Sequence, residues 1–309
     1  MKVAVIVLNW NGGAHLAPCL ESVAAQAGAA IEPAERDLVV VDNGSTDGSA
    51  DRLEERHPAF RVLRLPTNRG YAGGNNAGIR WTTAPLVLLV NNDTVLAPGA
   101  LDAMCAQADD PHTAAVSPRV VYFDDSRIIN AAGLALTRAG EPVTRGRDAP
   151  DGPEWDRPAE IFGAHGACVL YRRAALEDVG LFDEDFFAYH EEFDLAWRLR
   201  RAGWNARYAP AARVRHHEGL SLRGDRGRLL YLTERNRWFA LWKNADLRFL
   251  WRALPALVAG EVAMLRHCLG LRTLVPLVAR RDALARLGPM LARRARARVP
   301  EAALDRWIV

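Results

Sequence analysis

Carboxylates, amides and imidazoles stand at several places in this 309-residue chain where apolar stretches end. The first is LVLLVNNDTVL (86–96), in which a run of Val and Leu stops at Asn91, Asn92 and Asp93 and then resumes. A strand buried on both faces accounts for the apolar part but not for its polar end. Magnesium and manganese sites use one or two carboxylates completed by substrate phosphates. Asp93 is therefore a candidate metal ligand.

A second carboxylate, Asp42, closes the apolar run in VVVDNGSTDGS (39–49) just before a tight turn. Ser45 or Asp47 can cap the helix that follows, but Asp42 itself belongs to the end of the strand. A carboxylate in that place can accept hydrogen bonds from a nucleobase N–H or a ribose hydroxyl. The residues alone leave capping and nucleotide binding both open.

A third segment, NRGYAGGNNAGI (68–79), is rich in glycine and asparagine. Its glycines allow close backbone approach, and Asn75 and Asn76 can donate hydrogen bonds. The spacing is not G-x-G-x-x-G, so the dinucleotide fingerprint is absent. A turn before a helix and a ligand-binding loop are both consistent with it.

The last groups are Glu191, Glu192 and Asp194 at the start of an amphipathic helix, and the adjacent His216 and His217. Acidic residues are common at helix N-termini because the macrodipole favours them. The alternative is that one of the three carboxylates is a general base that takes a proton from a nucleophilic hydroxyl. The histidines are either a surface pair or contacts to a metal or phosphate.

The elements that must position these groups alternate in type. Short apolar runs predict strands at 3–8, 37–42, 61–65 and 86–90, and helical patterns lie between them at 15–27, 49–56 and 74–81. Such alternation predicts an α/β fold with a mainly parallel sheet covered by helices on both faces. Ligands bind such sheets beyond the carboxyl ends of the strands, where Asn9, Asp42 and Asp93 all fall. The next elements predicted are a helix at 98–108, a strand at 114–122, a surface loop at 139–158 and the helix ending at Gly203.

Composition sets broad limits on the class of protein. The chain is 50% hydrophobic and 25% charged with a net charge of +3, which is ordinary for a globular protein and gives no argument for nucleic acid. Four cysteines without a C-x-x-C pair suit reduced thiols in the cytoplasm. The first apolar run is too short for a signal peptide, and no stretch of about 20 unbroken apolar residues predicts a transmembrane helix.

The end of the chain has a different composition. Between 266 and 298 it carries nine arginines against one acid, Asp282, with Leu, Val and Ala at helical intervals. One interpretation is a helical appendage whose arginines face solvent. The other is an interfacial helix attracted to anionic lipid, which would present the site to a lipid-linked acceptor.

Taken together and in order, these motifs resemble the family 2 glycosyltransferases of GT-A fold, especially their bacterial rhamnosyltransferase-like branch. The resemblance rests on VIVLNWNG (5–12), VVVDNGSTDGS, NRGYAGGNNAGI, LLVNNDTVL, the YHEEFDLAWRLRRAGW helix, RVRHHEGLS and YLTERNRWF (231–239). It implies a nucleotide-sugar-binding half at 1–95 and an acceptor-binding, catalytic half at 96–220. A C-terminal helical, Arg-rich extension then occupies 221–309.

The resemblance also implies roles for individual residues. Asp42 matches the position that binds the donor's base, and Asp93 matches the last Asp of D-x-D, which holds Mg²⁺ or Mn²⁺ on the diphosphate. His216 matches a position that contacts metal or diphosphate. Glu192 matches the catalytic base. Further donor contacts implied by the motifs are Asn9, Asn68, Gly73, Gly74, Asn75 and Asn92.

Two departures from the family pattern leave alternatives open. Asn91 replaces the first Asp of D-x-D, and Glu replaces Asp at the base position, so Glu191 and Asp194 also remain candidate bases. The implied activity is inverting transfer from a nucleotide-diphosphate sugar, with dTDP-rhamnose a candidate, to a hydroxyl of a cell-envelope glycan or lipid-linked acceptor. It implies a cytoplasmic protein, peripheral at the inner face of the plasma membrane. The rivals are a catalytically weak nucleotide-sugar-binding protein and a sugar-nucleotide nucleotidyltransferase, although no Gly-rich triphosphate loop supports the latter.

Overall fold

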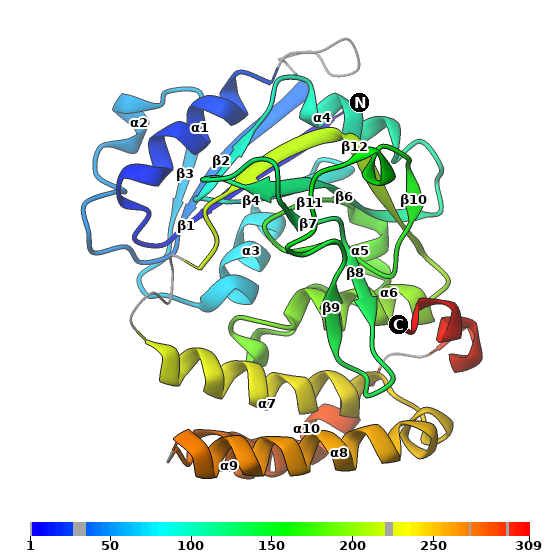
Figure 1. Cartoon of the computed structure of the whole chain (residues 1–309). Helices are drawn as coiled ribbons and strands as arrows, with labels where there is room; N and C mark the ends of the chain where they lie inside the picture. Colours follow the sequence, from blue (N-terminus) through cyan, green and yellow to red (C-terminus); the bar gives the residue numbers. More distant parts are fainter. Residues whose placement is uncertain (1, 27–34, 220–224, 272, 295–296) are drawn as a thin grey trace.

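The computed structural model describes residues 2–26, 35–219, 225–271, 273–294 and 297–309. Its main sheet has the strand order β10-β12-β6-β11-β4-β1-β2-β3, with β5 paired to β12 and β7 paired to β6 (Figure 1). The strands are β1 Val3–Asn9, β2 Arg36–Asp42, β3 Arg61–Arg64, β4 Leu86–Asn91, β5 Thr94–Leu96, β6 Thr113–Tyr122, β7 Ile129–Ala131, β10 Ala159–Glu160, β11 Cys168–Arg172 and β12 Asn205–His216.

The four strands predicted in the first part of the chain are adjacent and parallel. In register, Asn9 of β1 is opposite Asp42 of β2, and Leu8 is opposite Asn91 of β4. The polar ends of three strands therefore meet at one edge of the sheet, as predicted. The two predicted halves of the domain share this sheet, because β4 of the first pairs antiparallel with β11 of the second.

Helices cover both faces of the sheet, which confirms the predicted α/β architecture. The sheet is mixed rather than mainly parallel, because β5, β7, β10 and β11 pair antiparallel with their neighbours. One core contains Leu20 of α1 and Met104 of α4, and the core on the other face contains Ile79 of α3 and Leu195 of α6. The helices are α1 Leu16–Ala24, α2 Leu53–Arg56, α3 Gly70–Trp81, α4 Ala100–Ala106, α5 Arg173–Val179 and α6 Glu191–Arg201.

Two elements differ from their predicted extents. The helix predicted at 49–56 is reduced to α2, because the Ser49 amide donates to Asp47 Oδ1 and Arg52 adopts a left-handed φ of 52°. The loop predicted at 139–158 includes a strand, β9 (Pro142–Thr144), which pairs with β8 (Leu134–Leu136) in a separate hairpin.

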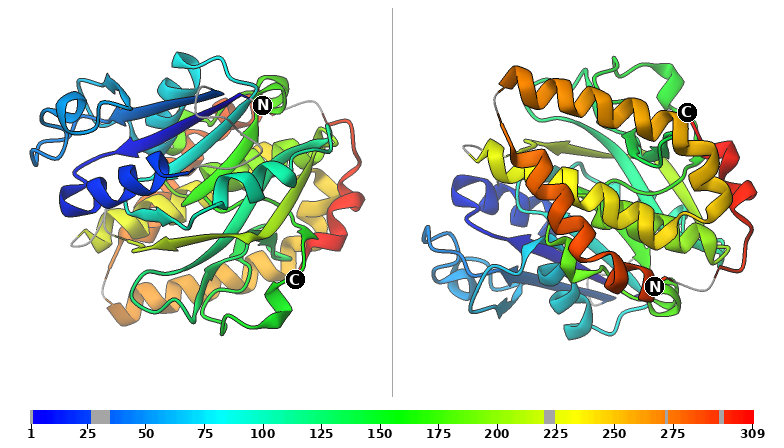
Figure 2. Two further views of the ribbon diagram at one scale, coloured as in Figure 1. Left: turned by 90° about the horizontal axis from the view of Figure 1, so that it is seen from above. Right: turned by 90° about the horizontal axis from the view of Figure 1, so that it is seen from below.

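Beyond β12 the chain forms a helical extension. It consists of α7 Arg226–Asn244, α8 Leu247–Leu271, α9 Val275–Ala285 and α10 Leu287–Ala292, and a 3₁₀ segment follows at Glu301–Trp307. A third core joins Trp197 of α6 to Phe239 of α7 and Phe249 of α8. Figures 1 and 2 show α7 next to the sheet domain, with α8, α9 and α10 as the outer layer.

One helix of the described residues, at Leu247–Gly270, is long and apolar enough to cross a membrane by length and composition alone. The expectation of no such helix is therefore not confirmed. That expectation was based on a search for unbroken apolar runs, and the run at Leu247–Gly270 is interrupted by Arg252, Glu261 and Arg266.

Candidate active site

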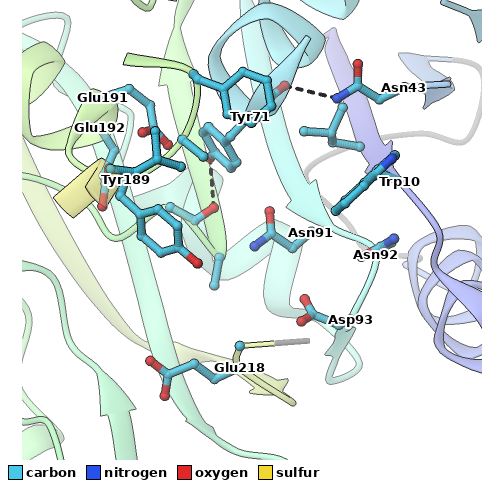
Figure 3. A pocket seen from close by; sticks show the side chains of 18 of the residues that line it. Trp10, Asn43, Tyr71, Asn91, Asn92, Asp93, Tyr189, Glu191, Glu192 and Glu218 are labelled. Carbon is cyan, nitrogen blue, oxygen red and sulfur yellow. Dashed lines mark hydrogen bonds between the residues drawn. The ribbon is translucent and has the colours of Figure 1, made fainter. Parts of the chain in front are cut away.

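A cavity of about 360 Å³ opens at the carboxyl ends of β1 and β4 (Figure 3). The opposite wall comes from the segment that precedes α6, from the first turn of α6, and from Leu229 and Leu232 of α7. The polar and aromatic side chains that line it are Trp10, Asn43, Asn68, Tyr71, Asn91, Asn92, Asp93, His165, Phe187, Tyr189, Glu191, Glu192, His216 and Glu218.

The cavity brings together half of the residues singled out from the sequence. Those on its wall are Asn68, Asn92, Asp93, Glu191, Glu192 and His216. Six others are outside the wall: Asn9, Asp42, Gly73, Gly74, Asn75 and Asp194. Their contacts explain why.

Asn9 is fully buried and holds neighbouring loops together. Its Nδ2 donates to Ser45 Oγ at 3.2 Å and to Ser49 Oγ at 3.1 Å, and its Oδ1 accepts from Asn92 Nδ2 at 2.9 Å. Asn9 therefore orients Asn92, which lines the cavity, and connects it to the turn after β2. Asp42 stabilises the same turn, because its Oδ1 accepts from the Ser45 amide at 3.0 Å.

The glycines of α3 serve close packing. A Cβ on Gly74 would lie 2.4 Å from Leu8 Cδ1, so the helix could not approach β1 with any other residue there. Gly70, which does line the cavity, has φ +71°, and a Cβ on it would lie 2.2 Å from the Phe187 carbonyl oxygen. Asn75 Nδ2 donates to the Tyr71 carbonyl within the helix at 3.1 Å.

Two neighbouring carboxylates at the start of α6 line the cavity, and each has one oxygen without a hydrogen-bond partner. The Oε2 atoms of Glu191 and Glu192 are buried and accept no hydrogen bond. Burial raises the pKa of both side chains, and that of Glu191 is raised further by the nearby Glu192. Glu191 is 3% exposed whereas Glu192 is partly exposed, so Glu192 is the more accessible of the two. Both have the raised proton affinity of a group that accepts a proton.

Asp194, one turn away, is in a different environment. Its Oδ2 accepts from Arg198 Nε and Lys243 Nζ, each at 2.9 Å, and its Oδ1 accepts from Asn244 Nδ2 at 2.8 Å. Burial alone would raise the pKa of Asp194, but the two cations hold it below its ordinary value. Its oxygens are occupied by partners away from the cavity, which favours a structural role.

On the other side of the cavity, Asp93 and His216 form a second pair. Asp93 Oδ1 is buried without a hydrogen bond, and His216 Nε2 is 3.4 Å from it. Burial raises the pKa of Asp93, but the His216 contact outweighs this and leaves it below the ordinary value. The carboxylate is therefore ionised at neutral pH.

A chain of contacts behind His216 fixes which nitrogen carries the proton in the neutral ring. Asn130 Nδ2 donates to Glu218 Oε2 at 2.8 Å, and Glu218 is also paired with Arg147. The Asn130 oxygen must then face His216 Nδ1, 3.0 Å away, so Nδ1 donates and Nε2 keeps its lone pair. When the ring is neutral, Nε2 and Asp93 Oδ1 are two acceptors that face each other, which favours a cation between them; when the ring is protonated, Nε2 pairs with the carboxylate itself.

The pair fits a divalent ion only in part. Among the described residues no three His, Cys, Asp or Glu side chains converge, so further ligands would have to come from substrate oxygens and water. That is the usual arrangement for Mg²⁺, which binds through one or two carboxylates plus substrate phosphates.

The segment Phe187–His190 leads directly into the two glutamates and is held in an unusual conformation. Phe187, Tyr189 and His190 have positive φ angles of 66°, 69° and 69°. Asn236 of α7, fully buried, donates to the carbonyls of Phe186, Ala188 and Tyr189 at 2.9, 2.8 and 2.7 Å. The helical extension thereby fixes one wall of the cavity.

Several cavity residues were not selected from the sequence. Trp10, Asn43 and Glu218 closely follow selected residues and could have been found by extending each motif. Tyr71 and Tyr189 lie inside two of the motifs but were not selected, and Tyr71 Oη donates to the Gly166 carbonyl at 2.8 Å. His165 carries no such signal, because it lies outside the motifs.

Comparisons with known proteins identify the family. The family described as Glycosyl transferase family 2 matches residues 4–180. An N-acetylglucosaminyl-diphospho-decaprenol L-rhamnosyltransferase of Mycobacterium tuberculosis is 31% identical over 282 residues, covering 82% of this chain and 90% of the relative. The low-salt glycan biosynthesis hexosyltransferase Agl10 of Haloferax volcanii is 27% identical, and the match covers 72% of this chain and 74% of the length of Agl10.

Solved structures share the fold at low sequence identity. S. aureus TarS 1–349 in complex with UDP-GlcNAc has a TM-score of 0.62 at 19% identity, covering 100% of this chain and 84% of that one. The mannosyltransferase PcManGT from Pyrobaculum calidifontis, in complex with GDP-Man and Mn²⁺, has a TM-score of 0.57 at 18% identity, covering 95% and 85%. The chain therefore belongs to glycosyl transferase family 2, is rhamnosyltransferase-like in sequence, and has the predicted GT-A fold.

Proposed function

We propose that this enzyme transfers a sugar, with inversion, from a nucleotide-diphosphate donor to a hydroxyl of a lipid-linked or cell-envelope glycan. The observation that carries the proposal is the pair of glutamates, each with a buried Oε2 that accepts no hydrogen bond, across the cavity from Asp93 (Figure 3). A base and a diphosphate-binding pair on opposite walls suit a displacement in which the attacking and leaving oxygens are on opposite faces of the sugar.

In the proposed reaction Glu192 takes the proton of the acceptor hydroxyl as its oxygen attacks the anomeric carbon. The bond from that carbon to the diphosphate oxygen breaks, and the nucleoside diphosphate leaves. A single displacement inverts the anomeric configuration without a covalent glycosyl-enzyme, unlike the two-step route of retaining hydrolases. Glu191 is the alternative base, and burial keeps the pKa of both glutamates raised.

The donor end of the cavity is rich in amides. We propose that Asn43, Asn68, Asn91 and Asn92 contact the donor, with Asn9 positioning Asn92 and with Asp42 at the base-binding edge. The donor sugar proposed is rhamnose, as dTDP-rhamnose, because the relative that covers most of this chain is an L-rhamnosyltransferase with a diphospho-decaprenol acceptor.

Asp93 and His216 would hold Mg²⁺ or Mn²⁺, whose contribution when bound is to neutralise the leaving diphosphate. Two of the structural neighbours were crystallised with Mn²⁺. Asn130 is then a positioning residue, because it holds His216 in the tautomer with a free Nε2.

We expect Asn130→Leu to weaken Mn²⁺ binding in the presence of nucleoside diphosphate by about 10- to 100-fold, the usual effect of losing an outer-shell partner. Asn130→Asp keeps an acceptor for His216 Nδ1, so we expect this variant to weaken Mn²⁺ binding less than Asn130→Leu does. Mn²⁺ titrations followed by electron paramagnetic resonance give the affinities without relying on turnover. Equal affinities in the natural chain and Asn130→Leu would remove this role.

The predicted contact between 266–298 and anionic membrane remains part of the proposal, but the arginines fit it less well than expected. Two of them pair with acids of the catalytic domain: Arg293 with Asp183 and Asp185, and Arg298 with Asp178. Two others join helices within the extension: Arg280 pairs with Glu234 and Glu261, and Arg294 donates to the Trp242 and Ala245 carbonyls. We propose a cytoplasmic enzyme, peripheral at the inner face of the plasma membrane.

A donor panel with purified protein tests the proposal. Nucleoside diphosphate release that needs both an acceptor and a divalent metal is the expected result. Tight donor binding without release would favour the binding-protein alternative. Formation of sugar nucleotide from a nucleoside triphosphate, with release of pyrophosphate, would favour the nucleotidyltransferase.

A further inference from the structure

The outer face of α8 is an exposed apolar stripe. Seven large side chains of its described part are spaced three or four residues apart, which places them on one side of a helix. They are Leu247, Trp251, Leu254, Val258, Val262, Leu265 and Leu269, with exposed fractions of 82, 77, 47, 55, 42, 46 and 80%. The stripe is about 33 Å long at 1.5 Å per residue.

The other side of α8 accounts for its attachment to the protein. Phe249 and Ala253 pack into the core shared with α6 and α7, and Met264 and Cys268 are also buried. The helix thus has one apolar side that folding uses and a second that it leaves exposed. Soluble monomers rarely expose a contiguous apolar surface of this extent, so the stripe calls for an occupant.

Charge around the stripe identifies the kind of occupant. Arg248, Arg252 and Arg266 are exposed, and 3.6 residues per turn puts them within about 40° of one another on one flank of the stripe. The one acid of α8, Glu261, is held by Arg237 and Arg280. Arg252 is paired with Asp305, whereas no ion pair is found for Arg248 or Arg266 among the described residues. An apolar face with a basic flank matches an anionic lipid surface. A second copy of α8 would offer these arginines no carboxylate.

We propose that α8 lies in the interface of an anionic phospholipid bilayer, with the stripe from Leu247 to Leu269 inserted among the acyl chains. The purpose of this contact rests on the proposed function. The α8–α10 layer covers α7 (Figure 1), and α7 supplies Leu229 and Leu232 to the cavity, so a membrane bound at α8 would lie near the active site. A lipid-linked acceptor would then be held in the same surface as the enzyme. The stripe overlaps the Arg-rich segment 266–298 only at its last residues.

The test uses the full chain and sedimentation with vesicles of phosphatidylcholine alone or with phosphatidylglycerol. We expect binding to the anionic vesicles, and a loss of about tenfold or more in the triple variant Trp251→Gln, Leu254→Gln and Val258→Gln, which removes three apolar anchors. Trp81→Gln, at an exposed apolar residue of α3, is the matched control and should bind like the natural chain.

Three outcomes would overturn the proposal. The triple variant binding as tightly as the natural chain would exclude the stripe. A lipid-free dimer in analytical ultracentrifugation that the triple variant abolishes would make a second copy the occupant. Natural protein that resists alkaline extraction from cell membranes would make α8 a spanning helix.

Activity measurements separate this inference from the proposed function. With a short-chain, water-soluble acceptor the triple variant should turn over like the natural chain, whereas with a vesicle-borne acceptor it should lose rate together with binding. If neither protein transfers sugar to either acceptor, the proposed function fails, and vesicle sedimentation still decides the membrane contact.

Discussion

Glu192→Gln is expected to lower the rate of sugar transfer by about 10²- to 10⁴-fold, the range for loss of a general base, and to leave donor binding close to its natural value. The amide keeps the shape of the side chain but cannot take the acceptor's proton. Single-turnover kinetics give the rate, and calorimetry with a non-transferable donor analogue gives the affinity. Glu191→Gln is the matched control, because it also lies on the cavity wall with an unpartnered Oε2. A larger loss in Glu191→Gln than in Glu192→Gln would reassign the base to Glu191.

The same substitution should stabilise the fold at neutral pH. Burial raises the folded-state pKa of Glu192, so stability falls as the pH rises from the pKa of an ordinary glutamate to that raised value, and the full cost applies above it. Glutamine removes this cost. Below the pKa of an ordinary glutamate, about 4.3, the side chain is protonated in both folded and unfolded chains and the difference should vanish. Thermal melts from pH 4 to 8 measure it, and a lower melting temperature for Glu192→Gln at pH 8 would contradict the burial argument.

Asn236→Ala should reduce kcat strongly although Asn236 is outside the cavity. Its amide holds three carbonyls of a segment with three positive φ angles, each of which costs about 1–3 kcal/mol and persists only where the surroundings enforce it. Released, the segment would move Tyr189 and the first turn of α6. A displacement of about 1 Å at a catalytic group can cost about 10²-fold in rate.

Asn244→Ala provides the control for a purely structural effect. Asn244 is also on α7 and donates to buried Asp194, but it makes no contact with the segment before α6. Both variants should lower the melting temperature. In Asn236→Ala alone, the factor by which kcat falls should exceed the factor by which the KM for the donor rises. Equal losses of kcat in the two variants would mean that Asn236 contributes stability alone.

The sequence predicted the catalytic edge well because that edge follows from strand periodicity. Apolar runs that end at Asn9, Asp42 and Asn91 had to finish at the same side of a parallel sheet, and they do. Which way each polar side chain points was not encoded in the pattern. Asn9 and Asn75 were assigned to the donor, but they make hydrogen bonds within the protein.

Contacts distant in sequence explain the remaining differences. Asn236 meets its carbonyl partners across 47 to 50 residues, so no local pattern revealed it. The excess of arginine at 266–298 suggested a basic face without partners. Several of these arginines form ion pairs with acids from other segments, for example Arg298 with Asp178 and Arg293 with Asp183. The apolar stripe was missed because arginines and one glutamate divide it in the linear sequence.

The most direct test of the central claim is the anomeric configuration of the product. Purified enzyme, dTDP-rhamnose, a lipid-linked N-acetylglucosamine acceptor and Mn²⁺ or Mg²⁺ are followed by NMR as the donor is consumed. We expect a new glycosidic bond whose anomeric configuration is opposite to that of the donor, formed in step with free nucleoside diphosphate. A product that retains the donor configuration would contradict single displacement assisted by Glu192.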